Sequence, residues 1–285
     1  MPGSRTYSTE AIVLRQRRLG DADKIVTLFT PNFGRIEVVA KGVRRTKSRL
    51  AGHVEVLSHC NLLLHRGRSL DVISQAQLLE NYGPLREDLS LVSRSLYAAE
   101  LVERFTDTSM DSFPTFSLLV ETLRVLAADS YPPDTVLRYF EMRLLGELGY
   151  QPQVESCVSC DQALAEETNL YSGRAGGVLC PTCRPEGQVS GPLSVNALKV
   201  LRVMQRVSFA EVGRIALDGQ LQAELERHLR DHIDFTLERE VRSAAFLREV
   251  QRQEGAGRSF DGRVASEACP TAVDLKRDRS EAACR

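Results

Sequence analysis

The chain has 285 residues, of which 42% are hydrophobic and 26% charged, and its formal net charge is −1 at pH 7. This length allows two or three domains with separate cores, and the composition is ordinary for a soluble globular protein. We expect no membrane span and no signal peptide. No uninterrupted apolar run approaches the roughly 20 residues that cross a bilayer, and Met1–Tyr7 contains no apolar run at all.

The small net charge conceals an uneven distribution. Residues 1–80 hold 13 Lys and Arg against 7 Asp and Glu, a net charge of +6. Residues 81–156 hold 6 against 12, a net charge of −6. Because a basic surface attracts polyanions, we expect the first section, and not the second, to meet nucleic acid.

The first 80 residues carry the short apolar and β-branched runs that are typical of strands. The predicted strands are 10–15, 24–30, 35–41, 54–65 with a break near residues 59–61, and 70–76; turn signals lie at Pro31–Gly34 and Arg66–Ser69. Five strands in so short a segment favour a small closed barrel, which removes exposed sheet edges. Its size is that of an oligonucleotide/oligosaccharide-binding (OB) barrel, although the strand count equally permits an SH3-like barrel.

From Leu89 the apolar residues follow a helical period. The predicted helices are 89–106, 113–128, 134–148 with Asp134 as N-cap, 195–207 capped by Ser194, and 220–246. Residues beyond Arg252 show no periodicity and are predicted to be disordered. The fold class is therefore α+β and multidomain: an OB-type barrel over 1–80, a helical bundle over 81–150 and 190–250, a cysteine segment over 151–189 inserted in that bundle, and a tail over 251–285.

Four cysteines form two C-x2-C pairs, Cys157 with Cys160 and Cys180 with Cys183, separated by 19 residues. This spacing is typical of a four-thiolate zinc site. Because four protein ligands fill a tetrahedral site, one structural and non-catalytic Zn²⁺ ion is expected. Segment 151–189 has little apolar content, so we expect the metal to stabilise it in place of a core. The other cysteines, Cys60, Cys269 and Cys284, are scattered, which suits a reducing cytoplasm.

The paired cysteines have an alternative interpretation as a thiol redox sensor or oxidoreductase. Redox C-x2-C motifs usually open a helix, which lowers the thiol pKa. Cys157 instead follows Glu155 in a polar stretch, an unfavourable neighbour for a thiolate.

The strongest nucleic-acid signal is a cationic loop between two predicted strands. Five cations fall within nine residues, with no carboxylate and with small residues expected to keep the loop mobile: Lys41, Arg44, Arg45, Lys47 and Arg49. Such a loop can bind phosphates without sequence preference, although basic runs are also common on solvated surfaces. Candidates of second rank are Arg15, Arg17, Arg18, Lys24 and Arg35. Tyr7, Phe29 and Phe33 could stack on bases, but such aromatics more often belong to a core.

No enzyme motif accompanies this loop. The chain has no phosphate-binding G-x-x-x-x-G-K-S/T, no G-x-G-x-x-G after a strand and no G-x-S-x-G, so we expect no catalysis. His53, His59 and His65 are expected at the surface or a strand edge. His228 and His232 are expected to bond Asp231 and Asp234. A non-specific RNA-binding or scaffold protein remains an alternative.

Two groups of residues stand out when the barrel and the cysteines are taken together. The first comprises Ala11–Leu14, Leu19–Thr30, Phe33–Arg35 and Ala40–Arg45; the second is Leu144–Pro152, which precedes Cys157. Together they resemble the RecO family of bacterial recombination mediators, over about residues 7–250.

The resemblance implies an OB barrel, a helical body and a zinc segment. It implies binding of single- and double-stranded DNA, annealing of complementary strands, and loading of the recombinase RecA onto DNA coated by single-strand-binding protein. RecR and single-strand-binding protein would be partners, with RecA an indirect one, in the RecF pathway of repair. The protein would be cytoplasmic and associated with the nucleoid.

Overall fold

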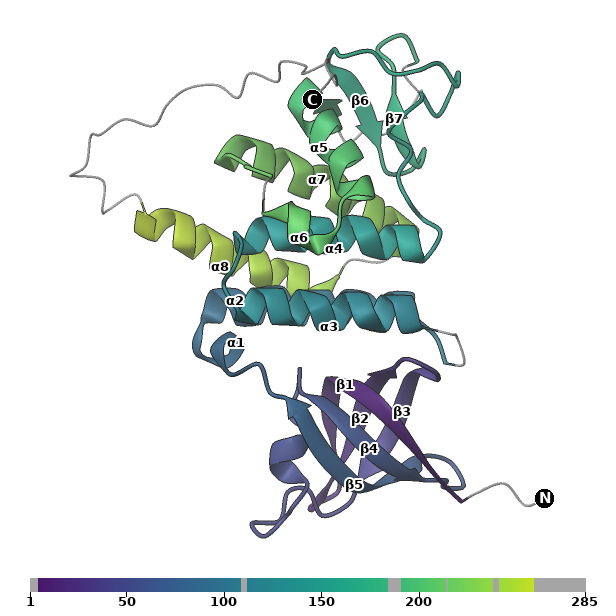
Figure 1. Cartoon of the computed structure of the whole chain (residues 1–285), viewed down its shortest axis with the longest axis vertical. Coiled ribbons are helices and arrows are strands. Elements are labelled where there is room, and N and C mark those ends of the chain that lie inside the picture. Colours follow the sequence, from purple (N-terminus) through teal and green to yellow (C-terminus); the bar gives the residue numbers. More distant parts are fainter. Residues whose placement is uncertain (1–4, 109–111, 184–190, 214, 238–240, 259–285) are drawn as a thin grey trace, which may run out of the picture.

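The structure is a computed structural model and describes residues 5–108, 112–183, 191–213, 215–237 and 241–258. A β-barrel lies at one end, helices are stacked over it, and a small β-sheet lies at the far end (Figure 1).

The barrel is built from β1 (Thr6–Leu19), β2 (Asp23–Thr30), β3 (Gly34–Ala40), β4 (His59–His65) and β5 (Asp71–Glu80). Its strand order is β1-β2-β3-β5-β4, and β1 also pairs with β4 to close it. The pairing of β3 with β5 is parallel, and all the others are antiparallel. This closed order is that of an OB barrel, so the predicted five-stranded OB-type barrel is confirmed.

Strand β1 is longer than the predicted 10–15, because it has two partners. Its first half, Thr6 to Ile12, pairs with β4, and its second half, Ile12 to Leu19, pairs with β2. The register shifts between Val13 and Arg15, where the strand passes from one partner to the other. Such a bulge bends a strand around a barrel.

The strand predicted over 54–65 is wrong in its first half, and the break expected near residues 59–61 is absent, because β4 runs through them. Ala51–His53 form a 3-10 turn, and Leu57 has a left-handed φ of 68°. The Leu57 N–H donates to the Val13 carbonyl at 2.7 Å, and the Val13 N–H donates to the Ser58 carbonyl at 3.0 Å. These bonds hold a bend against β1, and β4 begins only at His59.

The helices are α1 (Gly83–Glu87), α2 (Leu89–Phe105), α3 (Phe113–Ala127), α4 (Pro133–Glu147), α5 (Val195–Arg206), α6 (Phe209–Val212), α7 (Gly219–Leu237) and α8 (Arg242–Arg258). Barrel residues Ile12, Leu14 and Phe29 are buried in one core with them. The ring of Phe29 lies 6.1 Å from that of Phe116 in α3. The barrel and the helices therefore share a hydrophobic interface, and Phe29 is a core residue.

Two predictions for the C-terminal helices are wrong. The run 220–246 is not one helix, because α7 ends at Leu237 and α8 begins at Arg242. Residues 251–258 continue α8, although a disordered tail was expected from Arg252. Val241, Ala244, Leu247 and Val250 recur at helical spacing and are buried, so α8 has an apolar face. Residues 259–285 of the predicted tail lie outside the described part.

Asp134 is not the N-cap of α4, a position that Pro132 occupies. Asp134 lies in the first turn and pairs with Arg94 of α2 at 2.8 Å. Its carboxylate is drawn to a buried guanidinium, since only 2% of the Arg94 side chain is exposed.

The cysteine segment forms a small sheet of order β7-β6-β8, from β6 (Asn169–Ser172), β7 (Gly177–Leu179) and β8 (Gly191–Leu193). The expectation that this segment contributes to no core is wrong. Leu164, Tyr171, Val178 and Leu179 are buried in the same cluster as the helices. Residues 184–190, also part of the predicted segment, lie outside the described part.

Candidate nucleic-acid interface and cysteine cluster

The cationic loop of residues 41–49 is fixed at its base. Gly42 has a left-handed φ of 63°, and its N–H donates to Asp23 Oδ1 at 2.7 Å. Val43 is buried in the barrel core, and the Arg44 N–H donates to the Ala22 carbonyl at 3.0 Å. Two further turns follow, Arg45 N–H to Gly42 and Ser48 N–H to Arg45. The loop is therefore a series of turns docked beside the β1–β2 turn, and less free than its composition suggested.

All five cations of this loop are exposed: Lys41, Arg44, Arg45, Lys47 and Arg49. Arg44 donates from Nη1 to the Asp21 carbonyl at 2.9 Å, which ties it to the β1–β2 turn. None of the five forms an ion pair with a carboxylate of the described residues. Their positive charge is open to a ligand.

The second-rank cations have different surroundings. Arg15 pairs with Glu103 at 2.8 Å, Arg17 with Glu37 at 3.1 Å, and Arg35 with Asp107 at 3.4 Å. Lys24 Nζ donates to Gln16 Oε1 at 2.6 Å, and Arg18 is exposed. Carboxylates thus already neutralise three of the cations on the barrel face, in contrast to those of the loop.

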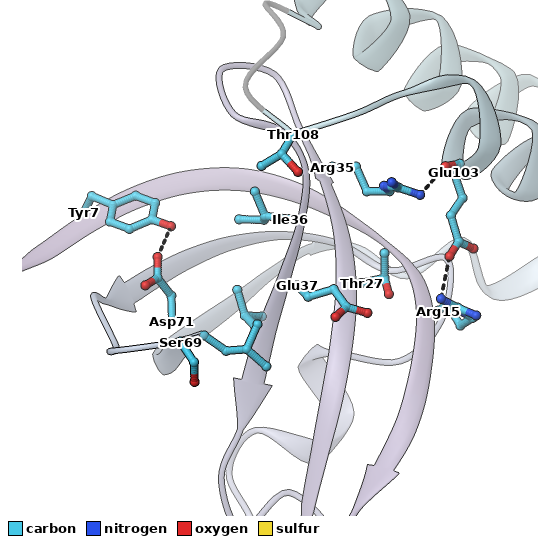
Figure 2. Close-up of a pocket in the computed structure, with 12 residues that line it drawn as sticks. Tyr7, Arg15, Thr27, Arg35, Ile36, Glu37, Ser69, Asp71, Glu103 and Thr108 are labelled. Carbon is cyan, nitrogen blue, oxygen red and sulfur yellow. Dashed lines mark hydrogen bonds and ion pairs between the residues drawn. The ribbon is translucent and has the colours of Figure 1, made fainter.

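A groove of about 520 Å³ lies on the barrel face beside the helices (Figure 2). Arg15 and Arg35 reach toward Glu103 at one end of it, and Tyr7 meets Asp71 at the other. The Tyr7 hydroxyl donates to Asp71 Oδ2 at 2.6 Å. Burial, reinforced by that carboxylate, raises the pKa of Tyr7 well above its ordinary value, so the phenol stays protonated.

Tyr7 also belongs to a small aromatic group. Its ring lies edge-on to Phe33 at 5.0 Å between centroids, and the Arg66 guanidinium lies 5.0 Å from its centre. Both rings are half-buried. The structure thus gives each ring a packing partner, and stacking on bases stays a prediction.

Two turns and one close backbone approach bring the four cysteines together. Val158 N–H donates to the Val178 carbonyl, and Val178 N–H donates to the Gln153 carbonyl, at 3.0 and 2.9 Å. This contact needs glycine at position 177, where a Cβ would lie 2.3 Å from the Gln153 oxygen. The first C-x2-C turn is thereby aligned with the second, beside β7.

The four Sγ atoms of Cys157, Cys160, Cys180 and Cys183 lie within 4.8 Å of one another. Cys160 Sγ and Cys180 Sγ are 3.9 Å apart. Zn–S bonds of about 2.3 Å in a tetrahedron require sulfurs about 3.8 Å apart. The cluster is therefore the right size, and has the right donors, to hold a metal ion such as zinc.

The thiols of this cluster are not equivalent. The Thr182 hydroxyl, 3.1 Å from Cys180 Sγ, lowers the pKa of Cys180 to about 6. Cys180 and Cys160 together raise the pKa of Cys183 to about 12. At Cys157 burial opposes ionisation, but backbone N–H groups, including that of Cys180 at 3.3 Å, lower its pKa on balance.

The histidines are not arranged as metal ligands. His59 is buried, pairs with Glu10 at 3.2 Å and has strand neighbours on both sides, in β1 and β5, so its prediction at the surface or a strand edge is wrong. His228 bonds to the Pro192 carbonyl, and His232 to the Tyr150 carbonyl and the Tyr171 hydroxyl, instead of Asp231 and Asp234. They fasten α7 to the sheet and to the end of α4, because these buried groups need partners nearby.

The sequence of the chain matches two family models of known proteins. Residues 4–82 match the family model described as "Recombination protein O N terminal", and residues 86–245 match "Recombination protein O C terminal". The chain belongs to the RecO family. Its resemblance to RecO is thereby confirmed.

Curated relatives agree with this assignment. The chain is 41% identical over 248 residues to the DNA repair protein RecO of Roseiflexus sp. (strain RS-1), covering 87% of each chain. It is 38% identical over 241 residues to that of Dehalococcoides mccartyi (strain CBDB1), covering 85% of this chain and 94% of the relative. RecO is a family of DNA repair proteins and not of enzymes.

The match to the RecO C-terminal model ends at residue 245, within α8, so the second half of that helix lies beyond it.

In the described part of the chain, no helix has the length and apolar character needed to span a membrane.

Sequence reasoning missed the carboxylates that face the barrel cations, Glu37, Glu103 and Asp107. A signal for two of them was present in the acidic charge of residues 81–156. That charge did not reveal which residues of α2 and its C-terminal extension would lie against the barrel.

Proposed function

We propose that this RecO-family protein is a DNA-binding recombination mediator. It anneals complementary single strands and helps to load RecA onto DNA coated by single-strand-binding protein, in the RecF pathway of repair. Single- and double-stranded DNA, RecR and single-strand-binding protein are its direct partners, and RecA an indirect one. It works in the cytoplasm, in association with the nucleoid.

One observation supports this proposal above the others: the loop of residues 41–49 exposes five cations that no described carboxylate neutralises. Phosphates are bound by such cations with release of counterions and without sequence preference. The proposed phosphate contacts are Lys41, Arg44, Arg45, Lys47 and Arg49. Arg18 extends them along β1, and Lys24, Arg15, Arg17 and Arg35 are contacts of second rank.

Annealing follows from where such a loop grips DNA. A protein that holds a strand by its phosphates leaves the base edges free to pair with a second strand. Cations in excess over carboxylates also reduce the repulsion between two phosphate backbones brought close together.

For the cysteines we propose one structural Zn²⁺ ion, held by Cys157, Cys160, Cys180 and Cys183. When bound, the ion would join the two turns by four bonds and leave no open position for chemistry. Its role is to fix the residues around β7, whose apolar side chains already pack on the helical core. The thiol redox alternative has less support, because the described residues 157–160 and 180–183, which form the two C-x2-C turns, are not helical.

A strand-annealing assay tests the proposed function. Complementary oligonucleotides are mixed with and without single-strand-binding protein, and duplex formation is followed over time. We expect the full chain to accelerate annealing under both conditions. The triple variant R45A/K47A/R49A should lose most of that acceleration, and R174A/K199A/R248A, which removes the same charge from exposed positions away from the barrel, should keep it.

Arg44 is left intact in this test because its side chain also supports the β1–β2 turn. Affinities for single-stranded DNA, RNA and duplex DNA, measured at the same salt concentration, distinguish the proposed function from the RNA-binding alternative. Absence of annealing by a folded protein that prefers RNA would contradict the proposal.

A further inference from the structure

The cations on the barrel face are matched by carboxylates from two sources. Glu37, which pairs with Arg17, lies on the barrel itself. Glu103 lies in α2, and Asp107 follows it closely. The Glu103 carboxylate lies 2.8 Å from Arg15, and its backbone carbonyl accepts from Arg35, also at 2.8 Å (Figure 2). The helical part therefore supplies the negative charge that Arg15 and Arg35 meet.

The groove between these residues does not attract phosphate as it stands. Its charged lining comprises two guanidiniums, Arg15 and Arg35, and three carboxylates, Glu37, Asp71 and Glu103. Glu37 is held by Arg17, and Asp71 accepts bonds from the Tyr7 hydroxyl and the Gly67 N–H. Glu103 is the lining carboxylate that comes from outside the barrel.

Strand β1 connects this groove to the cationic loop. From Arg15 the strand continues through Arg17 and Arg18 to the β1–β2 turn. The Arg44 side chain and the Ala22 carbonyl join that turn to the loop. A nucleic-acid strand bound at the loop and running along β1 would reach Arg15 next to Glu103.

We propose that Glu103 is an electrostatic gate on this groove: its carboxylate stays paired with Arg15 until a phosphate of bound single-stranded DNA takes its place. The inference rests on the proposed function and adds a regulated second contact to it. Exchange is feasible because 55% of the Arg15 side chain is exposed, and ion pairs with an exposed partner stabilise a fold only weakly. A phosphate can also bind a guanidinium through two oxygens.

The gate has a signature that a purely structural ion pair lacks. A phosphate that binds a free arginine releases a counterion from DNA. If the phosphate must first displace Glu103, that carboxylate stays beside the bound phosphate. The net positive charge that the protein brings to the DNA at this point, and with it the net counterion release, is then close to zero. The Arg15 contact therefore adds affinity in the native protein but little salt dependence.

The test is binding of the full chain to a single-stranded oligonucleotide over a series of salt concentrations. In Glu103→Gln, Arg15 is free before binding. The slope of log affinity against log salt should steepen by about 0.7, with affinity on the order of five- to tenfold higher at 50 mM salt. The double variant R15Q/E103Q should lose both gains.

Glu100→Gln is the matched control. It removes the same charge from the same helix at similar exposure, and Glu100 pairs with Arg104 in α2 and accepts from the Ser243 N–H in α8. Thermal unfolding checks that each variant is folded. If Glu103→Gln does not fold, Glu103→Asp withdraws the carboxylate by one methylene and should give a smaller gain of the same sign.

Equal slopes for wild type and Glu103→Gln would overturn the gate, as would an equal gain in Glu100→Gln. Failure of the gate is distinguishable from failure of the proposed function. If K47A/R49A weakens binding while Glu103→Gln changes nothing, the gate alone is wrong. If K47A/R49A leaves affinity unchanged, the proposed loop contact is wrong as well.

Discussion

Arg94 in α2 and Glu254 in α8 form an ion pair of 3.1 Å across 160 positions of the sequence. Arg94 is almost fully buried and also pairs with Asp134 at the start of α4. One guanidinium thus joins three helices, and Glu254 ties α8 to α2. Removing Glu254 leaves this buried guanidinium with fewer charged partners, Asp134 among them, and a buried charge that loses a partner destabilises the fold.

Glu254→Ala should therefore lower the free energy of unfolding by about 1–3 kcal/mol, measured by chemical denaturation. Glu249→Ala is the control on the same helix, because Glu249 is exposed and its partners, Arg252 and Gln253, are neighbours on α8. It should leave the free energy of unfolding nearly unchanged. Equal effects would show that the Arg94 contact does not stabilise the fold.

In a second ion pair, Arg138 with Glu141 in α4, both side chains are fully buried. Burial raises the pKa of Glu141 to about 7, against the influence of Arg138 and Tyr97. We expect Arg138→Met to cost about 3–5 kcal/mol, because it leaves Glu141 buried alone. The double variant R138M/E141L should recover most of that loss. Additive losses in chemical denaturation would contradict this account.

The cysteine cluster predicts a metal stoichiometry. The chain purified from cells should contain about one zinc per molecule by elemental analysis. Cys160→Ser should lose that zinc and unfold at a lower temperature, with only a secondary fall in DNA affinity. Cys60→Ala is the control, since Cys60 is buried in the barrel core and should leave the zinc in place. Full zinc retention in Cys160→Ser would contradict the four-thiolate site.

His228 predicts a loss of stability in acid. Burial lowers the pKa of His228 to about 4, so the folded protein holds it neutral while the unfolded chain protonates it near pH 6.5. The unfolded state then binds more protons between these values, and stability falls as the pH drops from about 6.5 to 4.

The measurement is the free energy of unfolding of wild type and His228→Gln between pH 7 and pH 4. The variant should lose less stability over that range, by about 2–3 kcal/mol. His65→Gln replaces an exposed histidine and is the control for the substitution itself. Parallel curves for wild type and His228→Gln would contradict the assignment.

Local sequence patterns predicted much of the barrel and the clustering of the four cysteines. Strand alternation and the turn at Pro31–Gly34 depend on neighbouring residues, and so does the C-x2-C spacing. The bend at residues 54–58, which were predicted as part of a strand, was missed. It depends on a hydrogen bond between Leu57 and Val13, which lie 44 positions apart in the sequence. Apolar residues such as Val54 and Val56 look like a strand whether or not they pair.

The pairing of charges could not be predicted from sequence for the same reason. Arg15 appears in the sequence as a cation near other cations, and only the packing of α2 on β1 brings Glu103 to it. Asp134 has the position of an N-cap, but a buried arginine from another helix binds it. In both cases a contact between distant segments decides what a charged residue does.

The salt dependence of single-stranded DNA binding tests the central claim most directly. Each phosphate contact contributes a slope of about 0.7 in log affinity against log salt for single strands. K47A/R49A should therefore bind more weakly than wild type, with a slope shallower by about 1.4. K199A/R248A, which removes the same charge from the helical part, should keep the wild-type slope. A K47A/R49A slope equal to that of wild type would contradict the assignment of DNA binding to the cationic loop.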